Sequence, residues 1–473
     1  MNRRQFVKTA STAAAASFVL PRFSIAQSKK SANEKLNVAF VGVGGIGAMA
    51  LNGMKSENVV ALCDLDWDYS AKNLKRFPNA QNAKKFTDYR EMLDKMGKDI
   101  DAVCISTPDH SHFKITLDSM SAGKHVCVQK PLVHNIWQCR ELKKAAKYYT
   151  NLKTQMMNQG HATEQIRLLR EWYEAGVTGG VNEVHVLCGG PAWWKGKGTP
   201  YFVKPNVWPL TKDTPPANFN FDLWLNQAKS RSFNKVYHPL SWRGFWDFGT
   251  GMLGDWFCHT GDAPVWILDL KAPSKIELID RKGDFDPSVF IPDTSIVKWT
   301  FPKTDKRDEV VMYWYDGNRP MITRPKDWDE KDVLTKGMVM VGKEHSIVTG
   351  VRPNFQPRIC NKEYFQSVRR QVKKTIPRVR EHSIYCEWID AIKGNGPECL
   401  GSFDYASQLT EVALLGCLAQ RFGGTIEWDD ANMCAKNRPE LNAFIKEEER
   451  EGWKSDSQRP WEKKQSFWSR LFG

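Results

Sequence analysis

Six consecutive residues near the start of the chain have the spacing of a phosphate-binding turn: Gly42, Val43, Gly44, Gly45, Ile46 and Gly47. They follow an apolar run and precede a helical pattern that begins at Ala48. In the pattern G-x-G-x-x-G, the first glycine permits a tight turn, the second lets a pyrophosphate approach the backbone, and the third lets the helix pack on the strand. The pyrophosphate then lies at the helix N-terminus, on free N–H groups at the positive end of the dipole. The motif therefore predicts a dinucleotide site formed by Gly42, Gly44, Gly45, Ile46 and Gly47.

An acidic residue at the end of the next apolar run indicates which dinucleotide is bound. Asp64 lies 22 residues after Gly42, close to the separation of about 20 residues at which an acid contacts the adenosine ribose. A carboxylate at this position accepts a hydrogen bond from the 2′-hydroxyl and repels a 2′-phosphate. We therefore expect NAD as the cofactor and favour it over NADP.

The elements that must position this turn are visible as short apolar runs alternating with helical patterns. The runs lie at residues 37–43, 59–64, 102–107, 125–129 and 154–158, and amphipathic stretches lie at 89–95 and 135–149. This alternation predicts βαβ units around a parallel sheet. We assign residues 36–160 to a Rossmann domain that binds NAD.

The pattern changes after residue 160. A helix is expected at 163–173 and a second at 404–421, and strand-like runs occur at 183–188, 275–279, 295–301, 309–315 and 338–341. The spacing predicts an α+β domain with a mostly antiparallel sheet over residues 161–431. The overall fold class is therefore α/β. Residues 432–473 are charged, and we expect a solvated tail.

The first segment is predicted to be a targeting peptide. Residues 1–26 carry Arg3-Arg4, an apolar stretch of 12 residues, and small residues before Ala26. This pattern is similar to a twin-arginine export signal, and the stretch is shorter than the roughly 20 residues needed to span a bilayer. We expect cleavage after Ala26, export to the periplasm, and a flexible arm at residues 27–35. No other run approaches the length of a membrane span.

The composition excludes several other classes of protein. The chain has 473 residues, a formal net charge of +14, 41% hydrophobic residues and 11 cysteines. Four of the positive charges belong to the predicted export signal, and the others are scattered without a basic cluster, so we expect no nucleic-acid partner. The odd number of cysteines, with no C-x-x-C pair, argues against a disulfide framework. Cys63, Cys104, Cys127 and Cys188 lie in apolar runs and are expected to be buried thiols.

Five blocks of the sequence together resemble the glucose–fructose oxidoreductase / inositol dehydrogenase (Gfo/Idh/MocA) family. The most specific block is Gly123-Lys124-His125-Val126, which continues through a strand to Lys130-Pro131. The blocks are residues 42–47, 106–112, 123–132, 237–244 and 254–259. The resemblance implies an NAD-dependent enzyme that acts on a secondary alcohol of a sugar, glycoside or cyclitol. It also implies that the sheet of residues 161–431 is large and open, that this domain binds substrate, and that it forms the contacts of a homodimer or homotetramer.

The resemblance also implies roles for individual residues. Lys130 matches the active-site lysine of the family, and Asp255 and His259 match its D-x-x-x-H pair. Four residues apart on a helix, these two side chains share one face, where a carboxylate can support a histidine that transfers protons. Lys130 follows a strand, so it should lie at the carboxyl end of the parallel sheet, where such folds bind ligands. The family usually has glutamate before this lysine; here Gln129 is neutral, which leaves the proton state of the lysine open.

Further candidates line the two sides of the expected site. On the cofactor side these are Thr107, Pro108, His112, Gln129 and Lys130. His110 and His112 have an H-x-H spacing, but no matching ligand cluster accompanies them, so we expect no metal. Tryptophans are concentrated on the substrate side, with eight in residues 193–266 against two in residues 36–160. Because aromatic rings stack on sugars, the candidate substrate contacts are Trp193, Trp194, Tyr237, Arg243 and His259.

Export and cofactor use together restrict the reaction. Outside the cytoplasm NAD has no dependable supply, so the cofactor should be tightly bound and regenerated in place. Dehydrogenation of a sugar hydroxyl satisfies this requirement, and we favour it. Two alternatives remain: an NAD-dependent glycosidase that acts by transient oxidation and elimination, and a non-catalytic sugar-binding relative.

Overall fold

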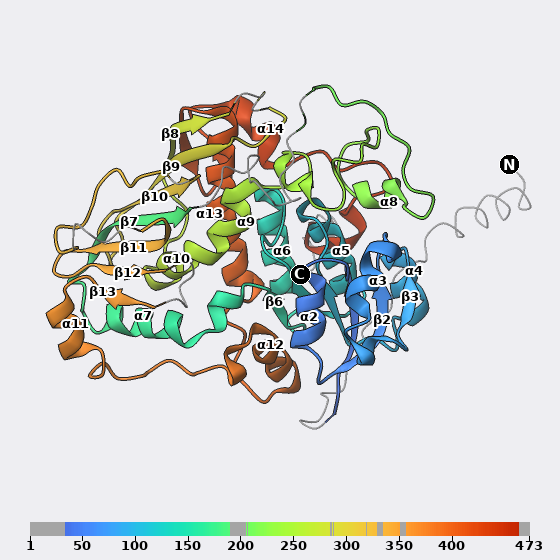
Figure 1. Cartoon of the computed structure of the whole chain (residues 1–473), viewed down its shortest axis with the longest axis horizontal. Helices are drawn as coiled ribbons and strands as arrows, with labels where there is room; N and C mark the ends of the chain where they lie inside the picture. The colour runs from blue at the N-terminus through green and yellow to red at the C-terminus, as the bar shows by residue number, and fades with distance from the viewer. Residues whose placement is uncertain are drawn as a thin grey trace, which may run out of the picture.

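The computed structural model describes two β-sheets separated by helices (Figure 1). The described residues are 34–189, 205, 207–283, 286, 288–317, 319–328, 334–350 and 356–462. The predicted export signal, its cleavage site after Ala26 and most of the predicted arm lie outside these ranges. Within them, no helix is long and apolar enough to cross a membrane.

The first sheet is parallel throughout its paired strands and has the order β3-β2-β1-β4-β5-β6. The strands are β1 (Asn37–Val41), β2 (Asn58–Cys63), β3 (Lys84–Phe86), β4 (Ala102–Ile105), β5 (His125–Val128) and β6 (Thr154–Met156). The helices that connect them are α2 (Gly47–Gly53), α3 (Trp67–Leu74), α4 (Tyr89–Met96), α5 (Asp109–Ser121) and α6 (Ile136–Tyr148). This is the doubly wound order of a Rossmann domain. The apolar runs locate every strand except the edge strand β3, which is only three residues long and begins with two exposed lysines.

The second sheet contains nine strands within the described ranges, in the order β13-β12-β11-β7-β10-β9-β8-β14-β15. All neighbours pair antiparallel except β7 and β10, which are parallel. The strands are β7 (Val181–Cys188), β8 (Lys275–Lys282), β9 (Thr294–Phe301), β10 (Val310–Asp316), β11 (Lys336–Gly342), β12 (Ile347–Thr349), β13 (Arg358–Ile359), β14 (Thr425–Asp429) and β15 (Cys434–Ala435). The predicted fold class, with a mostly antiparallel second sheet, is confirmed.

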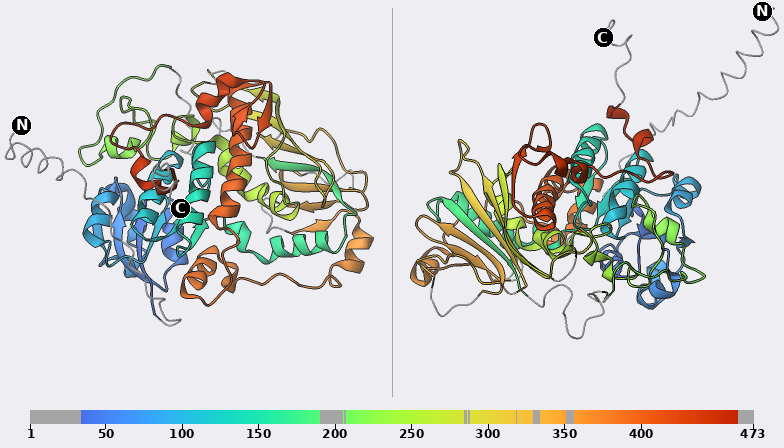
Figure 2. Two further views of the ribbon diagram at one scale, coloured as in Figure 1. Left: turned by 180° about the vertical axis from the view of Figure 1, so that it is seen from behind. Right: turned by 90° about the horizontal axis from the view of Figure 1, so that it is seen from above.

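Helices from both parts of the chain lie between the two sheets. The helices that follow residue 160 are α7 (Glu164–Glu174), α8 (Phe221–Leu225), α9 (Gly251–Thr260), α10 (Asp262–Ile267), α11 (Lys362–Val368), α12 (Ile384–Lys393), α13 (Phe403–Phe422) and α14 (Asn442–Ile445). The long helix α13 packs against α6 of the Rossmann domain and against α9, and it also contacts β8 and β9 (Figure 2). A single hydrophobic core runs from Val126 in β5 through Leu253 in α9 to Trp299 in β9. This continuous packing holds α9 in a defined position relative to β5.

All eleven cysteines lie within the described residues, and all are free thiols. Cys63, Cys104, Cys127 and Cys188 are buried, as predicted. Burial raises the pKa of the Cys63 thiol, and the nearby Asp64 carboxylate raises it further. These thiols therefore act as small apolar side chains in the core.

Residues 432–462, called the carboxy-terminal segment from here on, are packed against the protein, which differs from the solvated tail that their charges suggest. The remainder of the predicted tail, residues 463–473, lies outside the described residues. Trp453 is 4% exposed and belongs to the main core. The indole N–H of Trp461 donates to Glu141 at 3.0 Å, and the Arg459 guanidinium lies over the ring of Trp137. The charged residues of the segment therefore form ion pairs and cover aromatic rings, because long basic side chains pack through their apolar stems.

A partly buried ion pair connects this segment to the start of α6. His134 Nδ1 lies 3.1 Å from Glu447 Oε2. Burial lowers the pKa of His134, but the Glu447 carboxylate outweighs it and holds that pKa above its ordinary 6.5. Burial raises the pKa of Glu447, and the charge of His134 outweighs it in the same way, so that the pKa lies below its ordinary 4.5.

We expect this pair to stabilise the fold most between about pH 4.5 and pH 6.5. The stabilisation is lost as the pH rises through the raised pKa of His134, and also as it falls through the lowered pKa of Glu447. Glu447→Gln should therefore cost about 1 kcal/mol of unfolding free energy at pH 6 and much less at pH 9, measured by denaturant titration. Glu451→Gln, which alters an exposed ion pair of the same segment, is the control. An equal loss at both pH values for Glu447→Gln would contradict the ion-pair explanation.

Candidate functional site

The glycine turn has the backbone geometry that its sequence requires. Gly42 has φ +80°, and a Cβ atom there would lie 2.6 Å from the carbonyl oxygen of Ser106. A Cβ atom on Gly47 would lie 2.1 Å from the carbonyl oxygen of Gly42. A Cβ atom on Gly45 would meet nothing within 4 Å, whereas one on Gly44 would meet the ring of Tyr69. All three glycines of the motif, Gly42, Gly44 and Gly47, are therefore tightly packed, and the open space lies at Gly45. The motif alone assigns the approach of the pyrophosphate to Gly44, whereas the structure leaves that space at the next residue.

Asp64 is held in position by the turn that it faces. Its Oδ2 accepts hydrogen bonds from the backbone N–H of Val43 at 2.8 Å and of Gly44 at 3.1 Å. Its Oδ1 accepts from the N–H of Asp66 at 2.9 Å. A carboxylate has about four acceptor positions, so these three bonds orient the group and leave capacity for a ribose hydroxyl.

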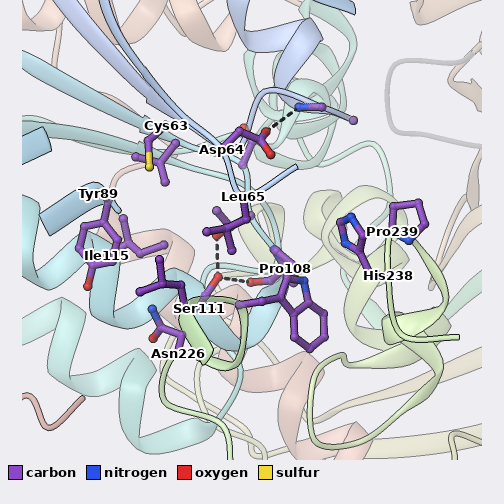
Figure 3. Close-up of a pocket in the computed structure, with 18 of the residues that line it drawn as sticks. Cys63, Asp64, Leu65, Tyr89, Pro108, Ser111, Ile115, Asn226, His238 and Pro239 are labelled. Atoms are coloured by element: carbon purple, nitrogen blue, oxygen red, sulfur yellow. Dashed lines mark hydrogen bonds between the residues drawn. The ribbon is translucent and has the colours of Figure 1, made fainter. Parts of the chain in front are cut away.

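The turn and Asp64 open into a cavity of about 980 Å³ that communicates with solvent (Figure 3). Tyr89 and Ile115 lie on one side of this cavity, and His238 and Pro239 lie on the other (Figure 3). It is formed by the carboxyl ends of β1, β2 and β4, by α5, by the segment around α8 and by the carboxy-terminal segment. The predicted site residues that line it are Gly42, Gly44, Gly45, Ile46, Asp64, Thr107, Pro108 and Arg243. The glycine turn and the Asp64 carboxylate in this lining are suited to the pyrophosphate and the adenosine ribose of a dinucleotide.

Lys130 connects the two halves of the protein. It follows β5, and its Nζ donates to Oδ1 of Asp255 at 2.6 Å and to the Asp255 carbonyl oxygen at 2.9 Å. Both side chains are partly buried, at 13% and 16% exposure. His259 lies one turn further along α9 and is buried. The three predicted catalytic residues therefore gather at the carboxyl end of the parallel sheet, where α9 meets it.

Neighbouring groups determine the charge of Asp255. Burial raises the pKa of this carboxyl, but the positive charges of Lys130 and Arg243 outweigh burial and hold it below its ordinary value. Arg243 Nε lies 3.9 Å from Asp255 Oδ1, and its guanidinium covers the ring of Trp242 at 4.2 Å. Asp109 nearby is buried, which raises its pKa, and its carboxylate accepts from the hydroxyl of Thr250 at 2.8 Å. The site thus contains an ionised Asp255 between two cations.

Four predicted residues on the cofactor side do not line the cavity: Gly47, His112, Gln129 and Lys130. His112 is 1% exposed, and its two ring nitrogens face the carbonyl oxygens of Pro131 and Thr107 at 2.9 and 2.8 Å. It therefore supports the backbone on both sides of the site. Gln129 is buried against the sulfur of Met157, and Gly47 lies in the first turn of α2. His110 is also buried, which lowers its pKa to about 3.

The predicted substrate contacts have three outcomes: some lie at the site, one lies in the core, and two fall outside the described residues. Tyr237 is 3% exposed and packs in an aromatic cluster with Phe245 and Phe248, so it is a core residue. The adjacent His238 lines the cavity instead, with Nε2 2.9 Å from Asp66 Oδ2. Arg243 lies at the site, as described above. Trp193 and Trp194 are outside the described residues.

Two residues that line the cavity, Asn226 and Trp453, belong to no sequence motif that would have predicted their place there. Asn226 follows α8 with φ +49°, and Trp453 comes from the carboxy-terminal segment. Trp453 is 348 residues from the end of β4 but reaches the same cavity as Pro108 and Ser111. In the described part of the chain, no group of three or more His, Cys, Asp or Glu side chains is arranged to hold a metal ion.

The strand order, the glycine turn and the acid at the end of β2 define an NAD-binding oxidoreductase fold. Residues 36–155 match the family model described as "Oxidoreductase family, NAD-binding Rossmann fold". Residues 194–288 match the model described as "Oxidoreductase family, C-terminal alpha/beta domain". These two segments of the chain thus match the Rossmann and C-terminal models of the Gfo/Idh/MocA oxidoreductase family, and NAD is the cofactor of the Rossmann domain.

Curated relatives match part of the chain. The glycosyl hydrolase family 109 protein 1 of Shewanella sp. (strain MR-4) is 28% identical over 145 residues, which cover 29% of this chain and 31% of the relative. The inositol 2-dehydrogenase of Salmonella paratyphi B is 28% identical over 111 residues, covering 23% of this chain and 32% of the relative. The matched segment thus spans about a third of each of these relatives.

Solved structures match over most of the chain. The WlbA dehydrogenase of Bordetella pertussis, in complex with NADH and UDP-GlcNAcA, has a TM-score of 0.55 at 18% identity, covering 84% of this chain and 99% of that one. A levoglucosan dehydrogenase in complex with NADH has a TM-score of 0.55 at 17% identity, covering 83% and 98%. At these identities the similarity establishes a shared fold.

Proposed function

We propose that this protein oxidises or reduces a secondary hydroxyl of a sugar, glycoside or cyclitol, using NAD that stays bound between turnovers. The observation that carries the proposal is the contact of Lys130 with Asp255, with His259 one helical turn away. This arrangement brings a cationic donor, a carboxylate and a histidine to the end of a parallel sheet next to a cofactor cleft. The sugar dehydrogenases among the relatives and structural neighbours support this substrate class.

Each residue has a defined part in the proposed reaction. His259 accepts the proton of the substrate hydroxyl, and Lys130 donates a hydrogen bond to the same oxygen and stabilises its developing charge. The ammonium group has three donors, of which two are directed at Asp255, so the third is available to substrate. NAD, when bound, supplies the hydride acceptor. Gln129 gives Lys130 no charged neighbour, and the negative charge comes from Asp255 on α9 instead.

Export gives the proposal its cellular setting. We propose that the protein acts in the periplasm after twin-arginine export, because residues 1–26 have the features of that signal. Proteins exported by this route are already folded, so a cofactor loaded in the cytoplasm would travel with them. This setting favours a cofactor that is regenerated in place.

A second candidate function is an NAD-dependent glycosidase. It is favoured by the similarity of the chain to glycosyl hydrolase family 109 proteins. In this chemistry a ring hydroxyl would be oxidised with transfer of its hydride to NAD⁺, the acidified adjacent carbon would lose its proton, and the aglycone would leave by elimination. Water would then add to the resulting double bond, and the hydride returned from NADH would reduce the carbonyl again. It uses the same proton acceptor and the same resident cofactor, so the two candidates differ in their products.

One experiment separates the two candidates. The protein is purified, its bound NAD(H) is quantified, and a panel of glycosides is then added while absorbance at the nicotinamide band and aglycone release are followed. A dehydrogenase should accumulate reduced cofactor together with a ketosugar. A glycosidase should release aglycone with no net reduction. Neither change with any sugar, glycoside or cyclitol would refute both proposals.

A further inference from the structure

The carboxy-terminal segment reaches the part of the cavity that is furthest from the catalytic residues. In the strand order of the first sheet, β2 and β3 lie on one side of the glycine turn and β5, which precedes Lys130, lies on the other. A dinucleotide across such a sheet places its adenosine on the β2 side and its nicotinamide on the β5 side. The cavity lining on the β2 and β3 side includes Leu65, Thr87, Asp88 and Tyr89, and Ile115 and Trp453 also line the cavity.

These side chains form a slot suited to a flat ring. Ile115 and Ser111 lie four residues apart on α5, so they share the face that lines the cavity. Tyr89 is held in place because its hydroxyl donates to Asp118 at 2.7 Å. The Trp453 ring lies 6.5 Å from the Tyr89 ring, and the Arg90 guanidinium lies over it at 4.3 Å. The Arg450 guanidinium lies over the same ring at 5.6 Å, so Trp453, at 4% exposure, contributes the small uncovered part of an immobilised ring to the cavity lining.

The segment that carries Trp453 is attached to the loop after α8. Arg450 Nε donates to the carbonyl oxygen of Asn226 at 2.8 Å, and its Nη2 donates to the carbonyl oxygen of Asp222 at 2.7 Å. The side-chain amide of Gln227 donates to Glu449 at 2.7 Å and to the carbonyl oxygen of Trp453 at 3.0 Å. These bonds join two walls of the cavity, since Asn226 and Trp453 both line it.

We propose that Trp453 forms one wall of the adenine site of NAD, and that the segment anchored by Arg450 is a clamp that slows release of the cofactor. This inference rests on the NAD-binding part of the proposed function and is independent of which sugar reaction is correct. It gives a structural reason for a cofactor that stays bound. The clamp encloses the adenosine half of NAD and leaves the Lys130 side of the site to the substrate.

The test measures cofactor release and fragment binding in the full chain. In Trp453→Ala, NADH should dissociate about tenfold faster in a stopped-flow displacement experiment, because stacking on a base is worth about 1–3 kcal/mol in alanine substitutions. AMP affinity, measured by calorimetry, should fall by about the same factor, whereas the affinity for nicotinamide mononucleotide should not change. Arg450→Gln, which keeps the ring but releases the clamp, should also speed NADH release.

Two further variants keep the proposal falsifiable. Trp453→Phe retains an aromatic ring and should release NADH at a rate between those of the wild type and Trp453→Ala, even if the alanine variant folds poorly. Lys454→Ala changes an exposed neighbour in the same segment and should leave both rates and affinities unchanged. Unchanged NADH release and AMP affinity in folded Trp453 variants would overturn the proposal. An equal loss of affinity for both fragments would also overturn it, because that would indicate general loosening of the fold. AMP binding is measured without any sugar. A negative result in the sugar assays would therefore refute the proposed reaction without affecting the adenine-site proposal.

Discussion

Replacing Lys130 with alanine should lower turnover of a glycoside substrate about a thousandfold and leave NADH affinity nearly unchanged. The ammonium group is the only donor that the proposed reaction places on the substrate oxygen, and removing a donor to developing charge costs about 10²–10³ in kcat. The loss also leaves Asp255 partly buried with one cation fewer, since only Arg243 remains near it. Single-turnover absorbance at the nicotinamide band measures this effect directly.

His259→Ala should lower turnover by a similar factor, about 10²–10⁴, because it removes the proton acceptor. Because Lys130 and His259 act on the same hydroxyl, the double variant should be little slower than either single one. The control is Lys393→Ala. Lys393 Nζ lies 3.0 Å from Glu57 Oε1 in a buried ion pair far from the site, so this variant should lower stability but not turnover. Wild-type turnover in both Lys130→Ala and His259→Ala would refute the catalytic assignment.

The second large effect is expected at the glycine turn. Gly42→Ala should abolish copurified NAD and lower the free energy of unfolding by about 3 kcal/mol. The added Cβ would combine positive-φ strain of about 1–2 kcal/mol with a clash against the Ser106 carbonyl. The backbone must then move, and the turn that approaches the pyrophosphate moves with it. Cofactor content after gel filtration and denaturant unfolding measure the two effects.

Gly176→Ala is the matched control for this prediction. Gly176 has φ +82°, almost the same as Gly42, but a Cβ there meets nothing within 4 Å. It should therefore cost only the strain of about 1–2 kcal/mol and retain bound NAD. If the two variants lost equal stability and both kept NAD, crowding at Gly42 would have no role in cofactor binding.

Local patterns predicted the parts of the fold that depend on neighbours in sequence. The apolar runs located β1, β2, β4, β5 and β6, because strands buried in a parallel sheet are continuously hydrophobic. The edge strand β3 lacked this signal, because two of its three residues are exposed lysines. The charged residues of the carboxy-terminal segment suggested solvent exposure, yet the structure pairs them with groups such as Glu141 and His134. Charge alone does not distinguish a solvated segment from one held by ion pairs.

Individual site residues could be predicted only where the residues that form one binding feature lie close together in the sequence. The spacing from Gly42 to Asp64 determined an NAD site, because turn, helix start and acid belong to one βαβ unit. Tyr237 and His238 are adjacent, and which of them faces the cavity depends on packing against Phe245 and Phe248. Nothing in a run of aromatic residues specifies that choice, since core packing and ligand contact use the same side chains.

The sequence by itself determined the cofactor and the class of fold, because both are encoded in short spacings that set backbone geometry. The catalytic roles of Lys130, Asp255 and His259 stay predictions that rest on the family resemblance. Only the tertiary structure decided how these parts meet. Lys130 and Asp255 are 125 residues apart and touch because a continuous core holds α9 against β5. Trp453 reaches the cofactor cavity because Arg450 attaches its segment to the loop after α8. Such contacts depend on the packing of whole helices and strands, so no local pattern in the sequence predicts them.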